Sequence, residues 1–102
     1  TGSANHAHYA TAKAGLLGLT YSAAKEYGAS GVTVNAVLPG RIETKMIADR
    51  SVGRLDEWLS QTPLNRLGRP DEVASMINFL ASDASSYITG ASINVNGGLV
   101  MG

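Results

Sequence analysis

The sequence predicts an α/β fold in which a long helix, a strand, a connection containing a second helix, and a second strand follow one another. Three observations predict it. Residues 5–29 are rich in Ala and Leu, residues 31–38 and 91–95 are β-branched runs, and a helical pattern starts at Pro70. Two strands joined through a helix form a right-handed crossover unit with a parallel sheet.

The first helix is predicted over about residues 5–29, with glycines at its end as stop signals. Its middle, residues 14–19, is six residues long and has no polar side chain, and six residues surround a helix of 3.6 residues per turn. We therefore expect this helix to be covered on more than one side. Gly15 and Gly18 lower helix propensity, which the close approach of another backbone would explain.

Residues 31–38 predict a strand with both faces largely covered, which ends before Pro39-Gly40. Within it, Asn35 is expected to be a buried hydrogen-bonding residue without a catalytic part. The stretch 41–69 holds six of the eight basic residues and four acidic ones, with weak helical periodicity at 42–49 and 55–61. We interpret it as a long irregular insertion, a lid packed by Leu55, Trp58 and Leu59.

The second helix is predicted over Pro70–Ser82, because proline suits the first turn and Asp71 and Glu72 suit the positive end of the helix dipole. Its expected buried stripe consists of Val73, Met76, Ile77 and Leu80. The second strand, residues 91–95, ends at Asn96-Gly97-Gly98. Two strands make a marginal sheet, so we expect the rest of a larger α/β sheet to be missing or supplied by another chain.

Composition limits the partners of the chain. Eight basic and eight acidic residues give zero net charge, which argues against nucleic acid or an anionic membrane as partner. There is no cysteine, no secretory signal at the start, and no apolar stretch near the roughly 20 residues that span a bilayer. We expect a soluble cytoplasmic protein. The chain lacks an initiator methionine, so it is expected to be a fragment or a processed piece.

Tyr9 and Lys13 are the candidate catalytic residues. They are four apart in the predicted helix, so they share a face with Cβ atoms roughly 5 to 6 Å apart. A tyrosine is a poor acid or base at neutral pH, and a neighbouring ammonium favours its ionised form. Alone, this spacing more often indicates an exposed pair, or a lysine stem lying over an aromatic ring, than a catalytic pair.

The surrounding motifs decide between these interpretations, because in their order and spacing the chain resembles the classical bacterial short-chain dehydrogenase/reductases. Within that family it is most like the 3-oxoacyl-acyl-carrier-protein reductases, although sugar, steroid and polyol dehydrogenases share these motifs. The resemblance covers essentially the whole chain. Its motifs are Tyr9-Ala-Thr-Ala-Lys13, Val34-Asn-Ala-Val-Leu-Pro-Gly-Arg-Ile-Glu-Thr44, Arg69-Pro-Asp-Glu-Val-Ala74, Phe79-Leu-Ala-Ser-Asp83, Tyr87-Ile-Thr-Gly90 and Val95-Asn-Gly-Gly98.

The resemblance implies a role for each matching residue. Tyr9 is expected to donate the proton to the carbonyl oxygen, and Lys13 to hold the nicotinamide ribose hydroxyls while favouring the phenolate. Pro39 and Gly40 are expected to line the nicotinamide. At the start of the insertion, Ile42 would meet the carboxamide through backbone atoms and Thr44 would add a side-chain hydrogen bond.

The resemblance also implies that residues 1–102 are the C-terminal portion of one Rossmann-type catalytic domain with a doubly wound parallel sheet. The family's glycine-rich loop, its ribose selector, and its catalytic asparagine and serine precede the tyrosine, and only eight residues precede Tyr9 here. Ser3 is too near Tyr9 to match that serine. We expect the cofactor-binding half to be absent, and this chain alone to be inactive.

Two histidines and one basic stretch are further candidate binding features. His6 and His8 have no third ligand at suitable spacing, so no metal site is assigned. The insertion 41–69, with six basic and four acidic residues and so a net charge of +2, would meet a phosphate-bearing substrate or an acidic carrier protein, or else is a solvated lid face.

The sequence is therefore interpreted as part of an oxidoreductase of fatty acid biosynthesis that uses NAD or NADP and a carbonyl or alcohol substrate, which a carrier protein would present. The small residues of the long helix predict a homo-oligomer, a homotetramer in the family. The alternative is a catalytically silent fragment that acts only by associating with another polypeptide.

Overall fold

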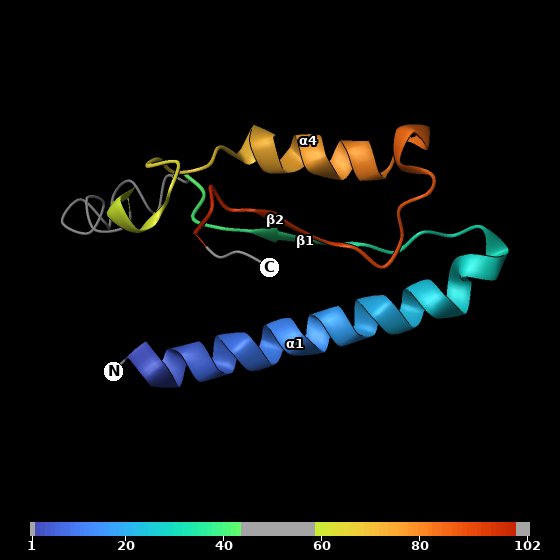
Figure 1. The fold of residues 1–102 in the computed structure, drawn as a ribbon, viewed down its shortest axis with the longest axis horizontal. Coiled ribbons are helices and arrows are strands. Elements are labelled where there is room, and N and C mark those ends of the chain that lie inside the picture. Colours follow the sequence, from blue (N-terminus) through green and yellow to red (C-terminus); the bar gives the residue numbers. More distant parts are fainter. Residues whose placement is uncertain (1, 44–58, 100–102) are drawn as a thin grey trace. The chain divides into compact units, whose positions relative to one another are not determined.

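The computed structural model describes residues 2–43 and 59–99, with side chains from residue 7 onward. The elements are α1 (Gly2–Tyr27), the 3-10 turn η1 (Gly28–Ser30), β1 (Ala36–Pro39), α4 (Pro70–Leu80), the 3-10 turn η2 (Asp83–Ser85) and β2 (Ser92–Val95), as Figure 1 shows. This order of helix, strand, helix and strand confirms the predicted α/β class.

The chain forms two compact units. The first comprises residues 1–36 and 86–92, and the second comprises residues 37–85 and 93–102. Among the described helices, none combines the length and the apolar character needed to cross a bilayer.

In the first unit, α1 begins three residues before the predicted start and ends two before the predicted end. The helix ends next to the glycines that the sequence indicated as stop signals. The chain continues into η1 and then reverses at Gly31, whose φ of 77° is left-handed and whose N–H donates to the Gly28 carbonyl at 3.0 Å.

One side of α1 is covered and the other is open within the described chain. Lys13 and Leu17 are half-buried and Thr20 and Ala24 are buried, at the spacing of a single helical face. Leu19, by contrast, is 68% exposed. A Cβ added at Gly15 or Gly18 would meet no described atom within 4 Å. The second cover that the sequence predicts for this helix is thus not supplied by the described residues.

The first strand is shorter than predicted: β1 starts at Ala36, and residues 32–35 lie outside it. In this stretch one backbone bond, from the Gly90 N–H to the Val34 carbonyl at 2.8 Å, is accompanied by side-chain hydrogen bonds in place of a regular ladder. The Val34 N–H donates to Thr89 Oγ1 at 3.0 Å. Asn35 Nδ2 donates to the Ile88 carbonyl at 3.2 Å, and its Oδ1 accepts the Ala91 N–H at 3.0 Å. Asn35 is therefore a hydrogen-bonding residue as expected, although half-buried instead of buried.

The two strands form a parallel pair (Figure 1). The Ala36 N–H donates to the Ala91 carbonyl and the Gly40 N–H to the Val95 carbonyl, both at 2.9 Å. The hydrogen-bonded residues thus increase in number in the same direction on both strands, as in a parallel pair. The expectation that both faces of the first strand are covered is wrong for this structure: only Ala36 is buried in β1. A sheet of two strands is too narrow to bury its own members.

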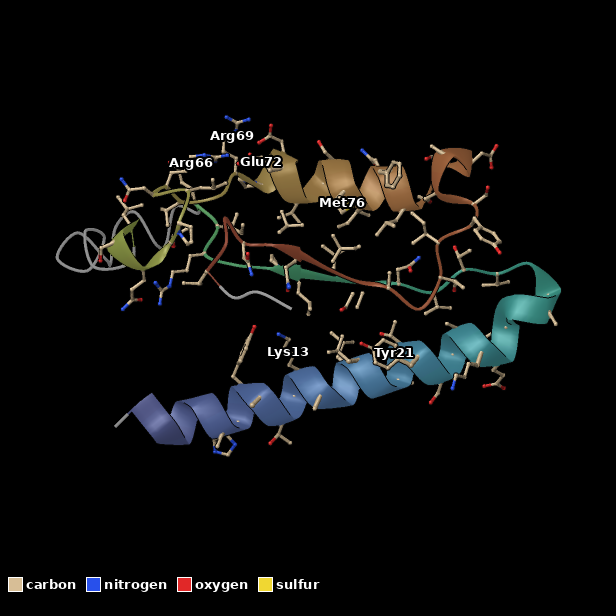
Figure 2. The ribbon with its side chains drawn as sticks, viewed as in Figure 1. Lys13, Tyr21, Arg66, Arg69, Glu72 and Met76 are labelled. Carbon is tan, nitrogen blue, oxygen red and sulfur yellow. The ribbon has the colours of Figure 1, made fainter. Side chains whose placement is uncertain are left out.

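In the second unit, α4 runs alongside the strands (Figure 1) and starts at Pro70 as predicted. It ends at Leu80, two residues early. The buried stripe is only partly correct, since Val73, Met76 and Leu80 are half-buried but Ile77 is 52% exposed. Met76 lies on the side facing the strands (Figure 2). Two strands do not offer enough surface to cover the whole stripe.

Of the predicted insertion, the structure describes residues 41–43 and 59–69. Residues 59–61 are helical and are followed by a turn. The expected helix at 42–49, most of the expected helix at 55–61, and the packing of Leu55 and Trp58 lie outside the described residues.

Candidate active site

Tyr9 and Lys13 lie one helical turn apart in the unbroken α1, as the sequence predicts. The Tyr9 side chain is 59% exposed and that of Lys13 is half-buried. Lys13 projects from the upper side of α1 in Figure 2. Residues four apart share a helix face. The phenol and the ammonium can therefore approach the same bound molecule from one side of the helix.

The residues between this pair are small. Between Tyr9 and Lys13 the helix carries only alanines and Thr11, whose hydroxyl donates back to the Ala7 carbonyl at 2.8 Å. From residue 9 to residue 20, Tyr9 and Lys13 are the only titratable side chains. Any acid–base chemistry along this part of α1 must therefore come from these two groups.

In the second unit, Pro39 is the last residue of β1 and Gly40 follows it. A Cβ at Gly40 would lie 2.5 Å from the Asn96 Cβ and 2.8 Å from the Asn96 Cα, closer than real Cβ contacts. The chain after β2 therefore requires glycine at position 40. This is a packing reason that sequence reasoning missed, and the expected contact with a flat ring stays a prediction.

Ile42 pairs with Gly68 in an isolated parallel bridge. The Gly68 N–H donates to the Arg41 carbonyl at 3.0 Å, and the Glu43 N–H donates to the Gly68 carbonyl at 2.7 Å. In such a bridge the flanking residues make the hydrogen bonds, so the N–H and C=O of Ile42 itself point away from Gly68. A donor and an acceptor side by side suit a carboxamide, which also carries one of each. The backbone of Ile42 thus fits the role that the resemblance implies.

Residues 62–69, which we call the clasp, connect the ends of both strands. The Leu64 N–H donates to the Gly97 carbonyl at 3.0 Å, after β2, and Gly68 holds the backbone after β1. Contact is close: a Cβ at Gly97 would lie 2.9 Å from Thr62 Cγ2. Ligands of α/β sheets bind at the carboxyl ends of the strands, which is the edge that the clasp contacts.

The clasp is joined to the start of α4 by an ion pair between Arg66 and Glu72 (Figure 2). Arg66 Nη1 lies 2.7 Å from Glu72 Oε1, and Arg66 Nη2 lies 2.8 Å from Glu72 Oε2. Glu72 Oε1 also accepts the Arg69 N–H at 2.9 Å. The hydrogen bonds from Arg66, and then that from the Arg69 backbone, lower the pKa of the Glu72 carboxyl to about 2. The same pairing raises the pKa of Arg66.

Sequence analysis missed Gly68 and the Arg66–Glu72 pair. A sequence signal for a close backbone contact was present, because a glycine stands at position 68 between Arg66 and the start of a helix. A cavity of about 420 Å³ lies beside the pair and the turn after β2, and no predicted site residue is among the residues that line it.

The predicted site residues thus fall into two groups. Tyr9 and Lys13 belong to the first unit, whereas Pro39, Gly40 and Ile42 belong to the second. Thr44 lies outside the described residues. Within the described part of the chain, no three His, Cys, Asp or Glu side chains gather as a metal site would require.

Comparisons with known proteins match nearly the whole chain. A family model described as enoyl-(acyl carrier protein) reductase matches residues 1–100. The 3-oxoacyl-acyl-carrier-protein reductase of Pseudomonas aeruginosa is 47% identical over 100 residues, which cover 98% of this chain and 40% of the relative. That of Salmonella typhimurium is 50% identical, with 98% and 41% covered. The chain therefore spans about two fifths of the length of these relatives.

Solved structures agree with these relatives. A 3-oxoacyl-acyl-carrier-protein reductase from Brucella melitensis superimposes with a TM-score of 0.87 at 42% identity, covering 93% of this chain and 35% of that one. A short-chain dehydrogenase/reductase from the same organism gives a TM-score of 0.83 at 46% identity, covering 94% and 39%.

Proposed function

The chain belongs to the short-chain dehydrogenase/reductase family, and from this premise we propose that the protein containing it transfers hydride between NAD or NADP and a carbonyl or alcohol substrate. The observation that carries the proposal is the placement of Tyr9 and Lys13 one turn apart in an unbroken helix. The proposal includes that residues 1–102 are the C-terminal portion of a Rossmann-type domain, whose doubly wound parallel sheet has its remaining strands in the rest of the protein.

In the direction of reduction, the Tyr9 hydroxyl donates a proton to the carbonyl oxygen of the substrate as that oxygen gains electron density. The bound nicotinamide supplies the hydride. The Lys13 ammonium holds the ribose hydroxyls and favours the phenolate that remains on Tyr9. In this reduction the proton moves from the Tyr9 oxygen to the substrate oxygen, and the Tyr9 phenolate is later reprotonated from solvent.

The nicotinamide is bound by the last residue of β1 and by residues that follow the strand. Pro39 and Gly40 line the ring, and the N–H and C=O of Ile42 pair with the carboxamide. The orientation of the Ile42 backbone, fixed by its bridge to Gly68, supports this assignment. Thr44 adds a hydrogen bond to the carboxamide or to a phosphate.

The proposed substrate is a 3-oxoacyl thioester presented by an acyl carrier protein, in fatty acid biosynthesis in the cytoplasm. The substrate class rests on the relatives named as 3-oxoacyl-acyl-carrier-protein reductases, at 47% and 50% identity. The protein is proposed to assemble as a homotetramer in which α1 packs against the same helix of another copy. The exposed Leu19 and the open space beside Gly15 and Gly18 in the described chain support that assembly.

The experiment uses the full-length protein. NADH and NADPH fluorescence is followed on mixing, and cofactor oxidation is then followed with a 3-oxoacyl thioester. Binding of one cofactor and turnover of the thioester support the proposal. A full-length protein that binds neither cofactor would contradict it and favour the silent-fragment alternative.

Lys13→Met tests the second catalytic residue. Removal of the ammonium should weaken cofactor binding, because the ribose hydroxyls lose a charged hydrogen-bond donor. The dissociation constant of the cofactor is measured for the variant and for the wild type. Unchanged binding would contradict the role of Lys13 in holding the ribose.

A further inference from the structure

We propose that Arg66 and Glu72 are positioning residues for the cofactor site, which fix the backbone of Ile42 against the nicotinamide carboxamide by acting through Gly68. The inference rests on the proposed function, because the contact between Ile42 and the carboxamide belongs to that function. Arg66 and Glu72 themselves touch neither cofactor nor substrate in this account.

The first step is the geometry of the ion pair. Isolated exposed ion pairs contribute little, but a bidentate guanidinium–carboxylate pair adds directional constraint. Here both nitrogens of the Arg66 fork reach both oxygens of Glu72, at 2.7 and 2.8 Å. The carboxylate is itself fixed to the helix start by the Arg69 N–H. Glu72 therefore holds Arg66 in one place relative to α4.

The second step concerns Gly68, which lies between the two groups that Glu72 binds. The Arg66 side chain precedes it by two residues, and the Arg69 N–H follows directly. One carboxylate thus closes a ring around Leu67 and Gly68. A backbone segment this short, held at both ends, has few conformations left to it.

The third step carries this constraint to Ile42. Gly68 makes both hydrogen bonds of the bridge, at 2.7 and 3.0 Å, to the residues on either side of Ile42. A Cβ at Gly68 would lie 2.7 Å from Ile42 Cδ1, so the side chain of Ile42 packs against this backbone. Rotation of the Gly68 peptide would therefore turn the N–H and C=O of Ile42 away from their bound orientation.

The chain offers a matched control in the neighbouring pair of Arg69 and Asp71. Arg69 Nε lies 3.1 Å from Asp71 Oδ1, by one nitrogen and one oxygen, and both side chains are mostly exposed. This pair stands at the same helix start and has the same charges, but the segment between its two residues does not include Gly68. Its loss should leave Gly68 in place.

The experiment compares Arg66→Gln with Arg69→Gln in the full-length protein. Dissociation constants are measured for the nicotinamide dinucleotide that the wild type binds and for the matching adenosine diphosphate ribose, which lacks the nicotinamide. For Arg66→Gln we expect the affinity for the dinucleotide to fall about tenfold, equivalent to about 1.4 kcal/mol. The affinity for the adenosine diphosphate ribose should not change. Arg66→Lys should give an intermediate loss, and Arg69→Gln none.

Two results would overturn the proposal. Equal weakening of both ligands by Arg66→Gln would indicate a general structural role, and unchanged affinity for both would indicate no role. A wild type that binds no dinucleotide would instead contradict the proposed function. In that case hydrogen exchange at the Gly68 and Glu43 amides tests the positioning step alone: faster exchange in Arg66→Gln than in Arg69→Gln supports it, and equal exchange refutes it.

Discussion

Gly40 has a packing role within the protein, beside the cofactor contact that is proposed for it. Its missing side chain lets the chain after β2 approach to within a distance that no Cβ would permit. The sequence indicated a close approach at this glycine, but the expected neighbour was a bound ring. The structure adds Asn96 as a neighbour within the protein, and this could not be predicted because residues 40 and 96 are distant along the chain.

Gly40→Ala should destabilise the protein. The added Cβ meets the Asn96 Cβ and backbone, which are not the free end of a flexible side chain, and overpacking of this kind costs about 1–3 kcal/mol. Thermal unfolding of the full-length protein measures the effect. Gly28→Ala is the control, since a Cβ there meets no described atom within 4 Å. Equal unfolding temperatures for the two variants would contradict the packing role of Gly40.

At the level of elements, α1 and α4 were predicted to within a few residues because their signals are local. Glycines end the first helix, and a proline with two acidic residues starts the second. The first strand was predicted too long, because its β-branched residues do not reveal that the Asn35 side chain bonds one carbonyl and one amide of a distant segment. Predicting these side-chain hydrogen bonds requires knowing which segment lies beside the strand.

The start of α4 should show a specific pH dependence. The Glu72 carboxyl has its pKa lowered from the ordinary 4.5 to about 2, so its stabilising contacts are complete above the ordinary value and are lost as pH falls through the folded one. The unfolding free energy of the wild type should therefore exceed that of Glu72→Gln by a constant amount near neutral pH. That difference should shrink below pH 4.5. Urea unfolding between pH 6 and pH 2.5 measures it, and a difference that persists undiminished at pH 2.5 would refute the assignment.

At the scale of the whole molecule, the α/β class and the motif order were predicted, and the burial was not. Only Ala24 and Ala36 are buried apolar residues in the described chain. The apolar stripe on α4 and the apolar residues 14–19 of α1 predict surfaces that should be covered. These patterns do not identify the segment or chain that covers them. The clasp was missed for the same reason, because its hydrogen bonds to the chain after each strand join residues that are far apart in sequence.

The proposed assembly through α1 is supported by the exposed Leu19 and the open space beside Gly18 in the described chain. Gly18→Glu places a charge on this face, so the full-length variant should sediment as a smaller species than the wild type, or fail to express in soluble form. Gly28→Ala again serves as control. A soluble and active variant of unchanged mass would show that this face is buried within the subunit, and would remove the basis for the proposed oligomer.

The central claim is that Tyr9 is the proton donor of a nicotinamide-dependent reduction. Tyr9→Phe removes the transferable proton and little binding surface, so the full-length variant should lose nearly all turnover of the 3-oxoacyl thioester while its cofactor affinity stays close to that of the wild type. The measurement is the turnover number at saturating cofactor, with the dissociation constant determined on the same sample. A variant that keeps more than about a tenth of the wild-type rate, a loss of less than about 1.4 kcal/mol, would contradict the claim.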